Sequence, residues 1–379
     1  MASAAKQVEA TYRVPYLAHA AMEPLNCTAW VREDGADVWT GTQNFLHTRA
    51  MAADVTGLDA DSIEVHSVML GGGFGRRGMF SPDYVRQGVD VARHVPYPVK
   101  TIWSREDDMR RDAYRPAITA RLAAGVDAGG APTAWLNDHI GKNEPSEAAH
   151  IPYGIANTRI RYADDGTHIP FGNWRSVAHS QHAFFTEAFF DEMAEAADRD
   201  PYELRRELLA DRPEMIAVLD AAAKAGDWGE EMEPGRGRGI AIAESFGSIV
   251  AQVAEVTVDA ETGVKVNRVV CAADTGEVIH PDGLEAQLES GIVFALSAAL
   301  FGEITIKNGR VVERNFPDYP MVKMADMPLI ETLLVPSGRA IGGGGEVGTP
   351  PLAPAVVNAI FAATGQRVRE LPLRKSGLT

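Results

Sequence analysis

Two runs of glycine stand next to residues that could do chemistry. The first is "GGGFGRR" (71–77) and the second is "GGGGE" (342–346). Because glycine has no side chain, such runs let the backbone pass close to a bulky ligand. Glu346 closes the second run, and a carboxylate held in an apolar loop can act as a general base near neutral pH. The simpler alternative is a helix-capping glutamate, since a helix that begins with proline follows it.

The first run matches a dinucleotide-binding loop only in part. That fingerprint needs G-x-G-x-x-G opening a helix, with an acidic residue at the end of the next strand. Here the glycines are consecutive, no clear helix start follows Arg77, and no such acid is evident. A dinucleotide-binding dehydrogenase is therefore disfavoured. A tight turn after a strand is the other simple explanation for a single glycine run.

Isolated polar residues elsewhere add little by themselves. Gln43 lies in the polar loop "TGTQNF", and Arg175 lies just ahead of a helical pattern in "FGNWRS". Alone, the first is typical of a surface loop and the second of half a salt bridge. His179 and His182 could suggest a metal pair, but ordinary helix-face histidines are more common than ligands.

Strand patterns followed by helical patterns occur twice along the chain, which predicts an α+β architecture. Period-two alternation predicts two long hairpins, whose turns contain the similar phrases "VDAGGAP" (126–132) and "VDAETG" (258–263). These turns suggest two halves built alike. Helices are expected over 46–55, from 176, from 201, over 214–224, over 284–300 and from 351.

A domain boundary is predicted at 226–239, because that segment is polar, glycine-rich and without periodicity. The first domain would span residues 1–228. The second would span residues 229–379 and carry Glu346.

Composition limits the classes of partner. The net charge of −16 argues against non-specific binding to nucleic acid or to an anionic membrane. Cys27 and Cys271 are too far apart in sequence for iron–sulfur or zinc spacing, so two buried thiols are expected. The longest apolar stretch (291–302) is too short to span a bilayer, and no secretory signal is recognised. No direct membrane insertion is expected, and the compartment stays open between cytoplasm and periplasm through co-export with a partner.

Several motifs in a fixed order resemble the molybdenum hydroxylases of the xanthine oxidase and aldehyde oxidase family. They are "GTQ", "MLGGGFGRRG", "SREDDM", "WRSVAHSQ" and "GGGGEVGTPPLAPAVVNAI". More narrowly, "PYLAHAAMEPLNCTAWV" and "ESFGSIVAQVAEV" resemble the large (beta) subunit of isoquinoline 1-oxidoreductase and related periplasmic aldehyde dehydrogenases. The resemblance runs from about residue 16 to about residue 373. It implies two similar molybdopterin-binding domains of strands and helices, equivalent to the carboxy-terminal half of such a subunit.

The resemblance also implies a reaction. A molybdenum cofactor would hydroxylate an aldehyde or an N-heterocyclic carbon, with water as the source of oxygen. Glu346 would be the general base, and Gln43 would hydrogen-bond to the apical oxygen of the metal. The pterin dithiolene would hold the molybdenum, so no protein metal ligand is expected.

Further positions are implied for the cofactor, which is expected as the cytosine dinucleotide of molybdopterin. Arg76 and Arg77 stand where many relatives have Gly-Lys, and their charge suggests contacts with the cofactor's pyrophosphate. Val177 and Met22 would face the substrate pocket, and a small Val177 would favour an aldehyde or a larger ring over a purine. The predicted cofactor-binding residues are Gly72, Gly73, Phe74, Gly75, Arg76, Arg175, Ser245, Gly247, Gln287 and Gly345.

Partners follow from the same resemblance. Electrons would leave through an iron–sulfur subunit that carries 2Fe–2S clusters. A companion chain would supply the amino-terminal half of the large subunit, and activity is expected only with these partners. The alternative is a non-catalytic scaffold or assembly subunit, against which the presence of Glu346, Gln43 and both glycine runs speaks.

Overall fold

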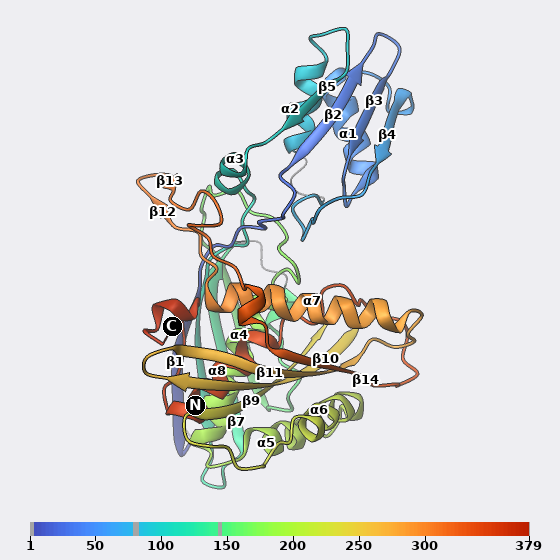
Figure 1. The fold of residues 1–379 in the computed structure, drawn as a ribbon. Coiled ribbons are helices and arrows are strands. Elements are labelled where there is room, and N and C mark those ends of the chain that lie inside the picture. The colour runs from blue at the N-terminus through green and yellow to red at the C-terminus, as the bar shows by residue number, and fades with distance from the viewer. Residues whose placement is uncertain (1–3, 79–82, 143–145, 379) are drawn as a thin grey trace.

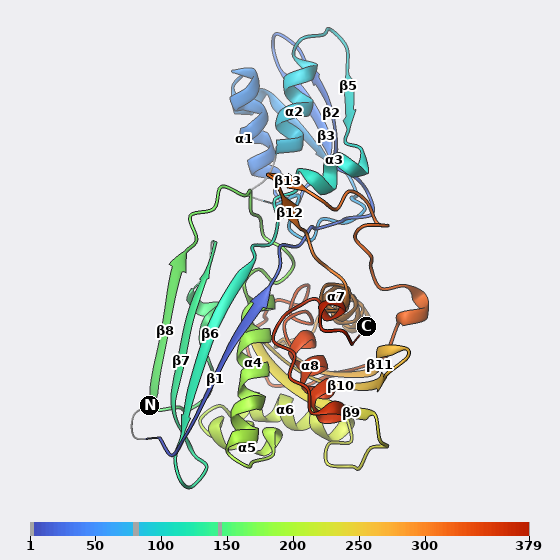
Figure 2. The ribbon, with the colours of Figure 1, turned by 90° about the vertical axis from the view of Figure 1, so that its left-hand side faces the viewer.

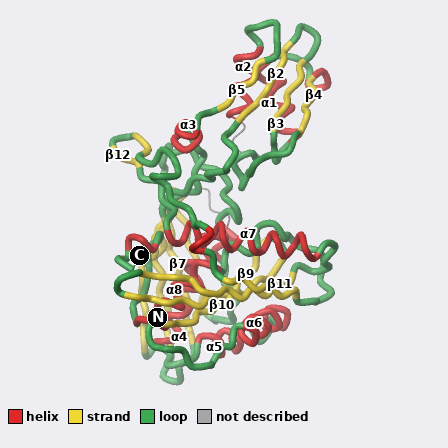
Figure 3. Tube along the Cα trace, in the orientation of Figure 1, coloured by secondary structure: helices red, strands yellow, loops and turns green. Residues whose placement is uncertain are grey.

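The computed structural model describes residues 4–78, 83–142 and 146–378, which form a small α/β unit standing off a larger body with two sheets (Figure 1). Much of the chain that joins the unit to the body is loop (Figure 3). The candidate residues of both glycine runs lie in loops rather than inside helices or strands.

The first sheet of the body has the strand order β1-β6-β7-β8. Its first three strands pair antiparallel, and β8 adds parallel to β7. The predicted hairpin at 126–132 is the β6–β7 turn. The strands are β1 (Lys6–Val14), β6 (Ile118–Val126), β7 (Pro132–Gly141) and β8 (Asn157–Asp164).

The second sheet repeats this topology in the order β9-β10-β11-β14, with β14 parallel to β11 and the other pairs antiparallel. The second predicted hairpin is its β10–β11 turn. The strands are β9 (Arg236–Ser245), β10 (Ser248–Asp259), β11 (Gly263–Asp274) and β14 (Leu329–Leu334). The α+β class and the two similarly built halves are therefore confirmed.

Helices α4 (His179–Ala196) and α8 (Leu352–Thr364) contact each other between the two sheets (Figure 2). Helix α4 packs on β1 and β6, and α8 packs on β9 and β10. Close approach of α8 depends on Gly239, since a Cβ there would lie 2.2 Å from the Ala359 backbone nitrogen. One hydrophobic core includes residues of both sheets. Packing thus continues across residue 228, and the boundary there stays a prediction about chain organisation.

Three more helices complete the body: α5 (Pro201–Leu208), α6 (Pro213–Ala225) and α7 (Pro281–Leu300). The apolar side of α6 covers β10 and β11, while α7 packs on α8 and β14. As expected, Asp200 caps α5, because its Oδ1 accepts hydrogen bonds from the backbone N–H groups of Tyr202 and Glu203.

The small unit has its own hydrophobic core and a sheet of order β4-β3-β2-β5. Its elements are β2 (Asn26–Val31), β3 (Ala36–Thr40), α1 (Phe45–Thr56), β4 (Ile63–Ser67), α2 (Asp83–Ala92) and β5 (Val99–Ile102). Helix α3 (Arg105–Arg110) and the hairpin of β12 (Ile306–Lys307) and β13 (Arg310–Val311) lie near its junction with the body (Figure 1).

Cys27 and Cys271 are both buried and free, as expected. Burial raises the pKa of each thiol to about 12, so both behave as small apolar side chains. Within the described ranges, no helix combines the length and the apolar character needed to cross a bilayer.

Candidate active site

Glu346 is held by a single residue that comes just before α4. The backbone N–H of Ser176 donates to Glu346 Oε1 at 2.9 Å, and the Ser176 hydroxyl donates to the Glu346 backbone oxygen at 2.6 Å. Ser176 is fully buried. Its two hydrogen bonds fix both the loop and the carboxylate, and no pattern in the sequence indicated a role for this serine.

The backbone at this contact is strained. Ser176 has φ 76° and Val177 has φ 49°, both in the left-handed region. A β-branched residue rarely adopts this conformation, and such strain costs about 1–3 kcal/mol for each residue. Here the strain aims the Ser176 N–H at the carboxylate. Val177, predicted to face the substrate, is half-buried beside that contact.

Arg175 joins three of the predicted positions. Its guanidinium donates to the Gly345 carbonyl (2.8 Å), to Ser290 Oγ (2.8 Å) and to Gln287 Oε1 (3.1 Å). It therefore ties the second glycine run to α7. Burial lowers the pKa of Arg175, and the nearby Glu346 carboxylate opposes this shift.

The first glycine run is bound to Gln43. Gln43 Oε1 accepts a hydrogen bond from the Gly75 N–H at 3.1 Å. A Cβ at Gly73 would lie 2.4 Å from that oxygen, and a Cβ at Gly75, where φ is 105°, would lie 1.4 Å from the Asn173 carbonyl oxygen. Only glycine fits at these two positions, so the loop presents backbone rather than side chains.

Aromatic stacking connects this loop to the body. The Phe74 ring stacks on Phe294 of α7 at 4.5 Å, and Phe294 stacks on Trp174 at 4.4 Å. Trp174 precedes Arg175 directly. The Gly72–Gly75 loop and the Arg175–Ser176 segment are therefore positioned by the same stack.

A turn between β9 and β10 lies against the second glycine run. Phe246 O accepts a hydrogen bond from the Gly343 N–H at 2.8 Å, and Ser248 Oγ donates to the Gly343 carbonyl at 2.7 Å. Of the predicted pair, Gly247 lies in this turn with φ 77°, and Ser245 is buried at the end of β9. The bonds to the glycine run come from their neighbours.

Arg76 and Arg77 have partners inside the protein. Arg76 Nη1 pairs with Asp83 Oδ1 at 2.9 Å and its Nε with Asp112 Oδ1 at 2.8 Å, while Arg77 Nη2 pairs with Glu23 Oε2 at 2.8 Å. Both arginine side chains are buried. These ion pairs shape the loop and do not support the predicted pyrophosphate contact, which stays a prediction. Met22, beside Glu23, is exposed.

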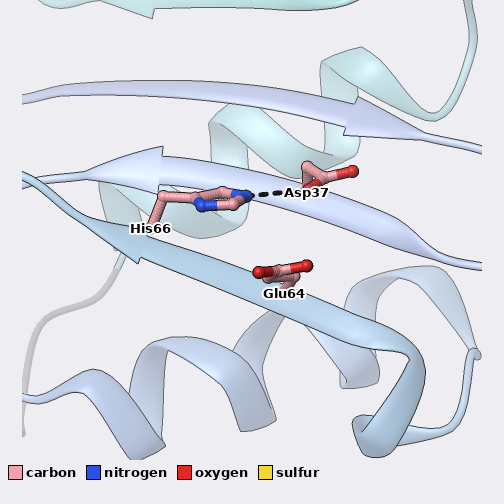
Figure 4. Close-up of side chains that lie close together, drawn as sticks. All are labelled: Asp37, Glu64 and His66. Atoms are coloured by element: carbon pink, nitrogen blue, oxygen red, sulfur yellow. Dashed lines mark hydrogen bonds and ion pairs between the residues drawn. The ribbon is translucent and has the colours of Figure 1, made fainter.

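Asp37, Glu64 and His66 form a cluster with metal-ligand chemistry on the small sheet (Figure 4). Their potential ligand atoms lie within 4.8 Å of one another. However, Asp37 already accepts from His66 Nε2 at 2.8 Å and pairs with Arg32 at 2.7 Å. These contacts account for the arrangement, and the cluster is separate from the loops that hold Glu346.

Ser176→Ala is expected to lower the free energy of unfolding by about 1–2 kcal/mol, because the Glu346 carbonyl would lose its buried hydrogen bond. Urea denaturation measures this. Ser376→Ala is the matched control, since its hydroxyl makes a similar bond to Leu373 O (2.6 Å) in a partly exposed turn. An equal loss in both variants would contradict a special role for Ser176.

The chain matches models of known domains over much of its length. A model described as "Molybdopterin cofactor-binding domain" matches residues 1–209, and a second model with that description matches residues 182–328. The beta subunit of isoquinoline 1-oxidoreductase from Brevundimonas diminuta is 31% identical over 392 residues, which cover 97% of this chain and 49% of that protein. A nicotinate dehydrogenase subunit from Pseudomonas putida is 29% identical over 418 residues, which cover 98% and 35%.

Solved structures share the fold at low identity. Quinoline 2-oxidoreductase from Pseudomonas putida 86 has a TM-score of 0.86 at 16% identity, covering 98% of this chain and 75% of that one. Aldehyde oxidoreductase from Desulfovibrio gigas has a TM-score of 0.82 at 17% identity, covering 98% and 60%. The chain spans about half or less of the length of the two curated relatives above.

Proposed function

Because this chain belongs to the molybdopterin cofactor-binding family of xanthine oxidase-type subunits, we propose that it is the molybdenum-binding half of an oxidoreductase that hydroxylates an aldehyde or an N-heterocyclic carbon. Water would supply the oxygen. The family resemblance of the motifs is thereby confirmed. One observation supports the activity above the others: the carboxylate of Glu346 is fixed by Ser176 between loops that expose only backbone.

The residues present fit such a cofactor. On one side, a Cβ at Gly73 would fill the space beside Gln43, and on the other a Cβ at Gly342 would lie 2.3 Å from Ser248 Oγ. A bulky group can approach both loops only because side chains are absent there. We assign its binding to Gln43, Gly72–Gly75, Arg175, Gln287 and the Ser245–Gly247 turn. When bound, the cofactor would supply the redox-active molybdenum that accepts two electrons from the substrate.

Glu346 is assigned the proton transfer. The Ser176 N–H fixes Oε1, which leaves Oε2 to accept the proton of the water-derived nucleophile. Arg175 holds the preceding carbonyl, of Gly345, so the carboxylate keeps its position during the reaction. In this arrangement Arg175 and Ser176 are positioning residues, and Glu346 is the base.

We further propose the cytosine dinucleotide form of the cofactor, an iron–sulfur partner with 2Fe–2S clusters and a companion polypeptide. The need for an electron partner is supported by the cysteines, since the two in this chain are buried in different sheets and cannot ligate a cluster together. The companion is supported by the share of the relatives' length that this chain leaves unmatched.

Metal analysis by plasma mass spectrometry tests the class of enzyme. Protein purified with its native partners is expected to contain molybdenum in nearly stoichiometric amount, with iron in the partner. A properly matured complex without molybdenum would contradict the proposed activity and favour a non-catalytic scaffold.

A further inference from the structure

A cavity of about 200 Å³, partly open to solvent, lies behind the candidate site. An apolar cavity of about 150 Å³ is enough to bind benzene in a protein, so this one can hold a single aromatic ring. Its walls are the first turns of α4, the short helix Ser146–Ala149 with the residues after it, and the end of β9. None of the residues assigned to the cofactor lines it.

The cavity adjoins the segments that hold Glu346. Helix α4 begins at His179, shortly after Ser176, and His179 lines the cavity. The His179 ring contacts the Phe246 ring edge-on at 5.2 Å, and Phe246 O accepts the hydrogen bond from Gly343. One turn of chain therefore separates the cavity from the loop that ends in Glu346.

Acidic groups outnumber free positive charges in the cavity wall. Arg212, the arginine of the wall, already pairs with Glu244 (2.9 Å) and with Glu214 (2.5 Å). Glu147, also in the wall, has no ion-pair partner among the described residues. The wall therefore carries an excess of negative charge.

Two other ionisable groups of the wall leave this balance unchanged. Glu187 is neutralised by Arg205 at 2.9 Å. Burial lowers the pKa of His179, so its imidazole adds no positive charge at neutral pH.

A hydrogen-bonding group in the wall lacks a partner. Thr186 is 5% exposed, and its Oγ1 makes no hydrogen bond to any described residue. Buried polar groups are nearly always satisfied, so such a hydroxyl indicates that a ligand or water completes it. The hydroxyl can donate to, or accept from, a polar atom of an aromatic ring or an amide.

We propose that this cavity receives the substrate and selects neutral or cationic aromatic molecules against those that bear a carboxylate. The inference rests on the proposed function and specifies its substrate class. A carboxylate would face Glu147 and Glu244, and it could reach Arg212 only by displacing an existing ion pair. Like charges placed together in a poorly solvated site oppose binding.

Binding of inert ligands tests this selectivity without turnover. Benzamidine, benzamide and benzoate share a ring and differ in charge, and isothermal titration calorimetry of the purified complex gives each Kd. Benzoate is expected to bind about tenfold more weakly than benzamide or worse. Combining Glu147→Gln with Glu244→Gln should reduce that ratio several-fold, whereas Glu261→Gln, in an exposed turn elsewhere, should leave it unchanged.

Thr186→Val separates binding from folding. Valine has a similar shape and removes only an unsatisfied hydroxyl, so the melting temperature should not fall. Benzamide should nevertheless bind several-fold more weakly. Equal affinities for benzoate and benzamide, or a ratio unaffected by the double variant, would overturn the inference. These outcomes do not depend on molybdenum content, so failure of the cavity assignment and failure of the proposed activity are distinguishable.

Discussion

Replacing Glu346 by glutamine is expected to abolish turnover while the cofactor and the fold are kept. A glutamine amide oxygen still accepts the hydrogen bond from the Ser176 N–H, so the loop should stay in place. The amide cannot take up a proton, and loss of a general base typically costs about 10²–10⁴-fold in rate. The measurement is kcat of the purified complex, with molybdenum determined on the same sample.

Glu289→Gln is the matched control for this substitution. Glu289 lies on the exposed side of α7 and has the same charge, so its removal should leave kcat unchanged. If Glu346→Gln kept most of its activity with normal molybdenum content, Glu346 would not be the base.

Gly73→Val is expected to remove the cofactor, which is the second large effect. The Cβ would lie 2.4 Å from Gln43 Oε1 and 2.8 Å from Gln43 Cδ, so Gln43 would be displaced. The branched side chain would also fill the space where only backbone now faces the ligand. We expect molybdenum content to fall to near background, as measured by plasma mass spectrometry on the co-purified complex.

The control for Gly73→Val is Gly154→Val. A Cβ at Gly154 meets its nearest atom at 3.4 Å, an ordinary contact, so this variant should keep its molybdenum. Circular dichroism of both variants separates loss of cofactor from loss of fold. Normal molybdenum in a folded Gly73→Val variant would show that this loop does not pass over the cofactor.

Local patterns in the sequence determined the secondary structure of the body well. The two hairpins and the cap at Asp200 were predictable because alternation, turn residues and capping depend on neighbours along the chain. The separate sheet of the small unit was not predicted. Alternation reveals that a stretch such as β4 is a strand, but it does not reveal which sheet that strand joins.

The sequence by itself determined the family, because its motifs keep their order, and it identified Glu346, Gln43 and the glycine runs as the candidate chemistry. Only the tertiary structure decided how these residues are held. Ser176 meets Glu346 across 170 positions, and Arg77 meets Glu23 across 54. Long-range pairs of this kind leave no local periodicity. The charges of isolated arginines therefore suggested a ligand where folding had already supplied carboxylate partners.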